Sequence, residues 1–180
     1  NGMTLHNDIV LPYYLGLATD DQKQRWLPKM VKGELIGALA ITEPNTGSDV
    51  ANVRTSAVRH GDTWVVNGAK TFITNGINSD LVITTVRTND QPGHRGLSLL
   101  ILERGMKGFE RGRNLSKLGM HAQDTAELFF TDVEVPSENM LGVEGQGFVY
   151  LMQNLAQERL NMAVGGVKVA SSALQATLDY

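Results

Sequence analysis

The sequence predicts an α+β protein in which an antiparallel β-barrel or sandwich is flanked by α-helices. Three observations lead to this prediction: helical apolar periodicity at both ends of the chain, short alternating segments in the middle, and turn residues between those segments. We expect helices over residues 1–34, a β-domain over 35–140 and helices again over 141–180.

Each element follows from local chemistry. A first helical stretch covers residues 3–18, and a second begins after Thr19, a suitable N-cap followed by two aspartates, and ends near Gly33. Segments rich in Val, Ile, Thr and aromatic residues then predict strands at 36–42, 54–60, 63–73, 81–87, 96–103 and 126–135. Turn segments such as HGD, NGINSD and NDQPGHRG separate them. Because these strands follow one another without intervening helices, they predict an antiparallel barrel or sandwich.

The C-terminal stretch returns to helical periodicity from about residue 144. Its apolar residues fall on one face, which we expect to bury surface; they are Phe148, Leu151, Met152, Leu155, Met162, Val169 and Ala173. We expect Gly165 and Gly166 to interrupt the helix, since two glycines cost about 2 kcal/mol relative to alanine. The chain begins without methionine and stops within a helical pattern, so we expect it to be part of a longer protein.

Composition excludes several classes of site and partner. The 180 residues allow a substantial core, and a net charge of −3 gives no basic footprint for nucleic acid. The absence of cysteine excludes disulfides and thiolate metal sites, and no apolar run approaches the roughly 20 residues of a membrane span. The histidines are scattered over expected loops and helix surfaces, so we predict no metal site; they are His6, His60, His94 and His121.

The stretch ALAITEPNTGSDV (38–50) has features of a ligand site. An expected strand leads into a loop in which Thr42 and Ser48 offer hydroxyl groups and Gly47 allows close approach of the backbone. Backbone N–H groups of such a loop can face an anion, so the segment suits a flat heteroaromatic ring and a phosphate. An ordinary β-turn with polar decoration explains the same residues.

The stretch NGAKTFITNG (67–76) is a second candidate. Phe72 and Thr74 are two residues apart, so they share one face of a regular strand. An aromatic ring and a hydroxyl on one face could cover a planar ligand and hydrogen-bond to its edge. Burial of Phe72 in the core is the alternative.

Together these stretches resemble the acyl-CoA dehydrogenase family. TEPNTGSD is similar to the flavin-binding signature that opens the family's middle β-domain, and NGAKTFITNG is similar to its second flavin segment. KLGMHAQDTAELFFTDVEVPSENMLG (117–142) resembles the closing strands of that domain, and GQGFVYLMQNLAQERL (145–160) the first helix of the C-terminal bundle. The resemblance implies that 1–34 ends an N-terminal helical domain and that 141–180 begins a C-terminal one.

The resemblance implies FAD as the cofactor and an acyl-CoA thioester as the substrate, which is oxidised to trans-2-enoyl-CoA. By position, it implies flavin contacts at Leu39, Ile41, Thr42, Gly47, Ser48, Phe72, Ile73 and Thr74. Phe72 would pack on the isoalloxazine, and Thr74 would hydrogen-bond to its reactive edge. Acyl-CoA contacts are implied at Ser48, Val149, Ala156, Gln157 and Arg159. We also expect Arg159 to be structural, anchoring a carbonyl or carboxylate in the core.

Glu158 lies on an otherwise apolar helix, next to Leu155 and Met162 on the same face. Desolvation raises the pKa of a carboxyl group, and a general base is most effective when its pKa is near the operating pH. A half-exposed residue paired with a neighbour explains the pattern equally, although the adjacent Arg159 does not face it. The resemblance to long-chain and isovaleryl-CoA dehydrogenases, a smaller group within the family, implies that Glu158 removes the α-proton while the β-hydride passes to flavin N5.

Three functions are consistent with these features. The first is an acyl-CoA dehydrogenase of fatty-acid or branched-chain catabolism that passes electrons to an electron-transfer flavoprotein; the second is an acyl-CoA oxidase that uses oxygen. The third is a non-catalytic β-barrel binding module. The resemblance implies a homodimer or homotetramer at full length, in the cytoplasm of a bacterium or the mitochondrial matrix of a eukaryote. We expect this chain alone to bind FAD weakly and to be inactive, because contacts from the C-terminal bundle are lost.

Overall fold

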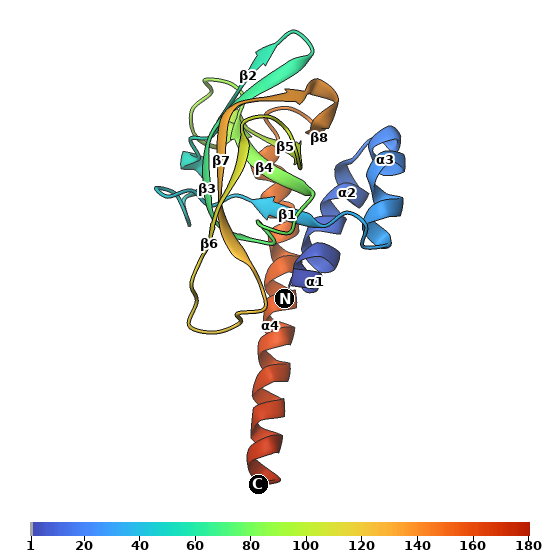
Figure 1. Ribbon diagram of the computed structural model, residues 1–180, viewed down its shortest axis with the longest axis vertical. Helices are drawn as coiled ribbons and strands as arrows, with labels where there is room; N and C mark the ends of the chain where they lie inside the picture. The colour runs from blue at the N-terminus through green and yellow to red at the C-terminus, as the bar shows by residue number, and fades with distance from the viewer. Residues whose placement is uncertain (1) are drawn as a thin grey trace.

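The computed structural model describes residues 2–180 and places helices at both ends of the chain around one β-sheet (Figure 1). The N-terminal helices are α1 (Gly2–Thr4), the π-helical segment η1 (Leu5–Val10), α2 (Leu11–Leu17) and α3 (Asp20–Val31). A long helix, α4 (Gly147–Leu178), ends the chain. Short 3₁₀ turns lie at η2 (Val50–Asn52), η3 (Gly93–Gly96) and η4 (Ser137–Asn139). The predicted α+β class is confirmed.

Helix α3 begins and ends as its sequence predicts. The Gln22 N–H donates to the Thr19 hydroxyl, and the Gln22 side chain accepts from the Thr19 N–H, which together form a capping box. At the other end, Gly33 adopts a φ of 72°, a conformation that glycine enters without a steric penalty.

His6 joins three elements in the interior, so the expectation that all four histidines lie on loops or helix surfaces is wrong. The Gly37 N–H donates to His6 Nδ1 at 2.9 Å, which places the ring proton on Nε2, 3.1 Å from the Met30 carbonyl oxygen. His6 is 6% exposed. The imidazole therefore ties η1 to the end of α3 and to the first strand.

The strands form one mixed sheet. They are β1 (Gly37–Ala40), β2 (Ser56–His60), β3 (Thr63–Thr74), β4 (Leu81–Arg87), β5 (Leu97–Glu103), β6 (Phe109–Asn114), β7 (Thr125–Pro136) and β8 (Met140–Leu141). The order is β6-β7-β3-β2-β4-β5-β8, with β1 also paired to β4. Most pairs are antiparallel, but β1 and β2 both run parallel to β4. Among the residues described, β6 and β8 do not pair, so the sheet is not closed into a barrel.

The parallel pairs were not predicted because they depend on long-range topology. The β2–β3 hairpin lies between β1 and β4 in the chain, and such an excursion is long enough for two strands to pair in parallel. Strands β6 and β8 were also missed. The segment FERGRN of β6 is charged and contains glycine, and it pairs with β7 alone at the edge of the sheet. Strand β8 has only two residues.

Both faces of the central strands β4 and β5 are buried. Val82, Leu100 and Leu102 pack in a cluster within the β-domain that includes Trp64, Val66, Ile73 and Phe130. The alternate residues of the same strands, such as Ile83 and Ile101, pack against the N-terminal helices and the start of α4. That second cluster includes Val10, Tyr13, Tyr14, Trp26, Met30 and Leu151. Burial on both faces explains why LVITTV and LSLLIL are apolar without alternation.

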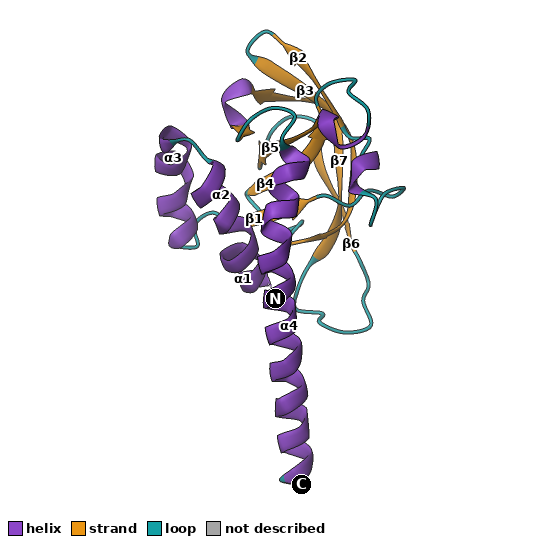
Figure 2. Ribbon diagram, turned by 180° about the vertical axis from the view of Figure 1, so that it is seen from behind, coloured by secondary structure: helices purple, strands orange, loops and turns teal. Residues whose placement is uncertain are grey.

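Helix α4 packs on the sheet only at its beginning. Leu151 is 3% exposed, whereas Met162 and Val169 of the same predicted face are 63% and 71% exposed, so the expected burial of that face is wrong for the second half. Figures 1 and 2 show this half extending away from the remainder of the protein. Gly165 and Gly166 do not interrupt the helix, since about 2 kcal/mol is too small a penalty to break 32 cooperative residues. Among the described helices, none combines the length and apolarity needed to cross a membrane.

Candidate active site

Glu158 lies on the side of α4 that faces the N-terminal helices. It follows Leu151 by about two helical turns, so the two residues share the face that packs on the protein. The Tyr13 hydroxyl of α2 donates to Glu158 Oε1 at 2.9 Å. The carboxyl group is half-buried, and Tyr13 is 1% exposed. The structure therefore brings together a carboxylate and a phenol from opposite ends of the chain.

Two opposing effects act on the pKa of Glu158. Burial raises the pKa of Glu158 above its ordinary value, and the hydrogen bond from Tyr13 partly offsets this by stabilising the carboxylate. Burial, with the nearby Glu158 charge, also raises the pKa of Tyr13 well above its usual range, so the phenol remains the donor. Among residues 2–180, no ion pair to Glu158 is formed. This arrangement suits a group that accepts a proton.

The expected acyl-CoA contacts on α4 lie on its other sides. Val149 is 39% exposed, and Ala156, Gln157 and Arg159 are all exposed. The expectation that Arg159 anchors a group in the core is therefore wrong, because successive helical residues point about 100° apart and Glu158 takes the inward position. The structure does not bring these four residues to the Tyr13 side of Glu158, and their role in binding remains a prediction.

A buried ion pair holds the base of the loop at 41–49. Glu43 Oε1 accepts from Lys70 Nζ at 2.9 Å and from the Thr55 N–H and hydroxyl, while its other oxygen accepts from the Arg54 N–H. Lys70 Nζ also donates to the Ile41 carbonyl oxygen at 3.0 Å. Burial lowers the pKa of Lys70 to about 8 although Glu43 opposes this, and the pair joins the loop to β3.

This pair was not predicted, although two signals for it are present in the sequence. A glutamate directly follows an apolar strand, and a lysine interrupts TWVVNGAKTFI, where charged residues are otherwise absent. A lone charge within an apolar strand must find a partner if it is buried, because an unpaired buried charge is costly.

The two expected flavin segments lie side by side. The Thr71 N–H donates to the Thr42 carbonyl oxygen at 2.9 Å, which joins the segment that follows β1 to β3. On the first segment, three of the expected contact residues are half-buried: Leu39, Ile41 and Thr42. The other two, Gly47 and Ser48, are exposed in the loop. A Cβ added at Gly47 would meet nothing within 4 Å, so the loop is open to a ligand on this side.

Phe72 stands out as an exposed aromatic residue in a strained conformation. It is 66% exposed, has a φ of 59° and lies at a register shift between Lys70 and Ile73 of β3. Left-handed backbone at a non-glycine residue costs about 1–3 kcal/mol, and an exposed ring gives nothing in return. A planar apolar ligand on the ring would offset both costs, so these residues fit a flavin. The bulge interrupts the pairing of β3 with β7, while burial still alternates over Phe72, Ile73 and Thr74.

The neighbours of Phe72 take different positions. Ile73 is 2% exposed and its side chain packs in the core, and a flavin contact at this residue remains a prediction. Thr74 is half-buried, and its hydroxyl oxygen accepts from Gln123 Nε2 at 3.3 Å. The hydroxyl proton of Thr74 is thereby left to donate to a ligand.

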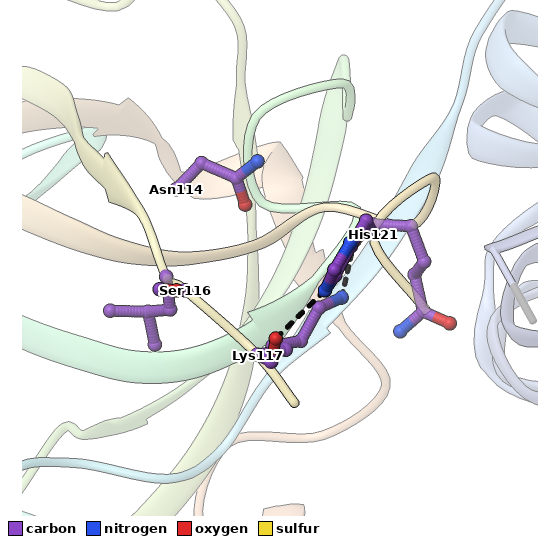
Figure 3. A pocket seen from close by; sticks show the side chains of 6 residues that line it. Asn114, Ser116, Lys117 and His121 are labelled. Atoms are coloured by element: carbon purple, nitrogen blue, oxygen red, sulfur yellow. Dashed lines mark hydrogen bonds between the residues drawn. The ribbon is translucent and has the colours of Figure 1, made fainter. Parts of the chain in front are cut away.

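A polar pocket of about 300 Å³ adjoins Thr74 through Gln123 (Figure 3). It is lined by Asn114, Leu115, Ser116, Lys117, His121 and Gln123. Lys117 Nζ donates to the Gln123 carbonyl oxygen and to the Thr125 hydroxyl, and His121 Nε2 lies 2.9 Å from the Lys117 carbonyl oxygen. This pocket was not predicted, because its polar residues show no periodicity in the sequence. Among the described residues, no group of three His, Cys, Asp or Glu side chains could hold a metal ion.

The N-terminal helices connect the two halves of this site. His6 binds the first residue of β1, and Tyr13 binds Glu158, so one helical segment positions both the loop-bearing strand and the carboxylate. The family description "Acyl-CoA dehydrogenase, middle domain" matches residues 38–133, more than half of the chain. The chain belongs to the acyl-CoA dehydrogenase family. This confirms the resemblance that the four motifs indicated.

Several acyl-CoA dehydrogenases resemble the chain over nearly its full length. The mitochondrial long-chain specific acyl-CoA dehydrogenase of Mus musculus is 50% identical over 99% of this chain and 42% of its own length. The mitochondrial isovaleryl-CoA dehydrogenase of Pongo abelii is 39% identical over 97% of this chain and 42% of its own length. A crystal structure of an acyl-CoA dehydrogenase from Geobacillus kaustophilus has a TM-score of 0.89 and 59% identity, covering 91% of this chain and 43% of that one. The chain thus spans about two fifths of these relatives.

Proposed function

We propose that the protein containing this chain is an FAD-dependent acyl-CoA dehydrogenase in which Glu158 is the catalytic base. The observation that carries the proposal is the state of Glu158: a half-buried carboxylate whose recorded partner is the Tyr13 phenol, with no cation paired to it among the described residues. Relatives that are long-chain and isovaleryl-CoA dehydrogenases by name support this class of reaction.

The chain's residues divide the work between two places. Glu158 accepts the α-proton of the acyl-CoA thioester, and the electron pair of that C–H bond forms the new double bond as the β-hydrogen leaves as hydride. Bound FAD supplies the hydride acceptor. Phe72 and Thr74 of β3, with Ile41, Thr42, Gly47 and Ser48 beside them, would hold the flavin; Phe72 offers an apolar face and Thr74 a hydroxyl proton. The buried Glu43–Lys70 pair keeps their loop in place.

The electron acceptor, assembly and compartment are also proposals. The names of the relatives favour a dehydrogenase over an oxidase, and the mouse and Pongo proteins are mitochondrial by name. We propose an electron-transfer flavoprotein as the electron acceptor. We propose a homo-oligomer in the mitochondrial matrix of a eukaryote or the cytoplasm of a bacterium. The proposed substrate class is acyl-CoA.

The test uses the full-length, FAD-loaded protein mixed anaerobically with long-chain acyl-CoA, while flavin absorbance is followed by stopped flow. Glu158→Gln should slow flavin reduction at least about 100-fold, because a positioned general base contributes roughly 10²–10⁴ in rate. Glu144→Gln, which changes an exposed carboxyl group just before α4, should leave the rate unchanged. Flavin reduction at the wild-type rate in Glu158→Gln would exclude Glu158 as the base.

A further inference from the structure

Two adjacent buried tyrosines on α2 differ in what their hydroxyl groups contact. Tyr13 and Tyr14 are 1% and 0% exposed. The Tyr13 hydroxyl donates to Glu158, whereas the Tyr14 hydroxyl has no hydrogen-bond partner among the described residues and its ring packs edge-on against Trp26. One of the two phenols thus serves packing, and the other reaches the carboxylate of the proposed base.

The direction of Tyr13 is determined by the helical segment that precedes it. Helix η1 is a π-helix, whose i→i+5 hydrogen bonds rotate all following side chains relative to a regular α-helix. Its position is held at two points: His6 binds Gly37 of β1, and the Asn161 side chain of α4 donates to the Asp8 carbonyl oxygen at 3.3 Å. The geometry therefore holds the Tyr13 hydroxyl in a fixed place against α4.

Tyr13 is the titratable residue that contacts the Glu158 carboxyl group in the described part of the chain. The other ionisable groups on the elements packed against this side of α4 are engaged or turned outward. On η1, His6 binds backbone atoms and Asp8 is exposed; on β5, Glu103 pairs with Arg25; on α4, Arg159 is exposed. On α2, the Tyr14 hydroxyl lies without a partner.

We propose that Tyr13 is a positioning residue whose hydroxyl holds the Glu158 carboxylate in one orientation and keeps it ionised while substrate binds. The proposal depends on the proposed function, in which Glu158 accepts the α-proton. A hydrogen bond donated to a carboxylate stabilises the charged form, so it opposes the effect of burial on the base. Without this bond, closure of the site by substrate would leave a desolvated carboxyl group that binds a proton from solvent before it can accept one from substrate.

The test compares Tyr13→Phe with Tyr14→Phe in the full-length, FAD-loaded protein. Both variants remove one buried phenol oxygen from the same helix and keep the ring, but only Tyr13→Phe removes a hydrogen bond to Glu158. The first readout is the pH dependence of flavin reduction by acyl-CoA. The acidic limb should move upward by about one pH unit in Tyr13→Phe, which is the effect of losing one charge-assisted hydrogen bond, and should not move in Tyr14→Phe.

The second readout does not depend on activity. The protonated-carboxyl infrared band of Glu158, assigned by difference against Glu158→Gln, is titrated in each variant without substrate. Its midpoint should shift upward in Tyr13→Phe by the same amount as the kinetic limb. A fluorinated tyrosine at position 13, which is a stronger donor, should shift the midpoint downward, so the direction of the effect is tested even if Tyr13→Phe folds poorly.

The outcomes separate the two proposals. If Glu158→Gln reduces flavin at the wild-type rate, the proposed function fails, and the infrared titration then shows only whether Tyr13 controls this carboxyl group. If Glu158→Gln is inactive but neither the kinetic limb nor the infrared midpoint moves in Tyr13→Phe, the positioning role of Tyr13 is overturned and Glu158 remains the base. Equal shifts in Tyr13→Phe and Tyr14→Phe would also overturn the positioning role of Tyr13. The loss of any buried phenol oxygen from α2 would then explain both shifts.

Discussion

Replacing Lys70 with methionine tests whether the buried pair with Glu43 stabilises the candidate flavin loop. The Lys70 and Glu43 side chains are 0% and 5% exposed, so water cannot replace the lost ammonium group. Removing one partner of a buried pair typically costs about 3–5 kcal/mol. We expect Lys70→Met to lower the free energy of unfolding by about 3 kcal/mol at pH 7, the low end of this range. One reason is that Glu43 keeps three other hydrogen bonds. The other is that the substitution also removes a strongly desolvated ammonium group.

The pH dependence of this loss gives a sharper number. Without Lys70, the buried Glu43 carboxylate can become neutral by binding a proton. For a carboxyl group with the ordinary pKa of 4.5, this protonation costs about 3.4 kcal/mol at pH 7 but only about 0.7 kcal/mol at pH 5. The variant Glu43→Gln/Lys70→Met needs no such proton. The free energy of unfolding of Lys70→Met should therefore lie about 3 kcal/mol below that of the double variant at pH 7, and within about 1 kcal/mol of it at pH 5.

Urea denaturation of the 180-residue chain, followed by tryptophan fluorescence, measures these free energies. Lys107→Met, at an exposed lysine, is the control and should change stability by less than about 0.5 kcal/mol. A loss below about 1 kcal/mol in Lys70→Met at pH 7, or an equal gap from the double variant at pH 5 and pH 7, would show that the carboxylate is solvated and that our estimate of the pair is wrong.

Two further predictions concern the same loop and its neighbour. Burial alone would raise the pKa of Glu43, but Lys70 and the hydrogen bonds from Thr55 and Arg54 lower this pKa below 4.5. The stability that the Glu43 carboxylate supplies is therefore fully present above pH 4.5, the unfolded value. It is lost as the pH falls through the lower pKa of the folded state. In thermal melts from pH 7 to pH 3, the advantage of the wild type over Glu43→Gln should therefore be constant above about pH 4.5 and shrink progressively below it, and an advantage that does not shrink between pH 4.5 and pH 3 would contradict this. Phe72→Asn should leave the stability of the FAD-free protein within about 1 kcal/mol of wild type, since asparagine tolerates a positive φ, while weakening FAD binding measured by flavin fluorescence. Undiminished FAD affinity would mean that the ring does not contact the flavin.

The sequence predicted those parts of the fold that depend on neighbouring residues. The capping box at Thr19, the stop at Gly33 and the strands of β2 to β5 all follow from local chemistry and periodicity. The parallel pairs of β1 and β2 with β4 could not be predicted in this way, because nothing within a strand records which distant strand it meets. Edge strand β6 carries too many charges to be recognised from its pattern.

The candidate site was predicted in outline, and its details depended on the structure. Glu158 could be singled out because a carboxylate on an apolar helix is unusual, but the sequence gives no reason to connect it with Tyr13, 145 residues earlier. Phe72 shows the limit of period-two reasoning, because the pattern gives no sign of its positive φ or of the register shift between Lys70 and Ile73. The interior position of His6 was likewise invisible, because its partners are backbone atoms of two other elements.

The central claim is that Glu158 exchanges a proton with the α-carbon of an acyl-CoA thioester. Its most direct measurement is the rate at which deuterium from solvent enters that carbon, followed by mass spectrometry with the full-length, FAD-loaded protein. Wild type should incorporate deuterium, and Glu158→Gln should do so at least about 100-fold more slowly. Incorporation at the wild-type rate in Glu158→Gln would contradict the account, whatever the fate of the flavin.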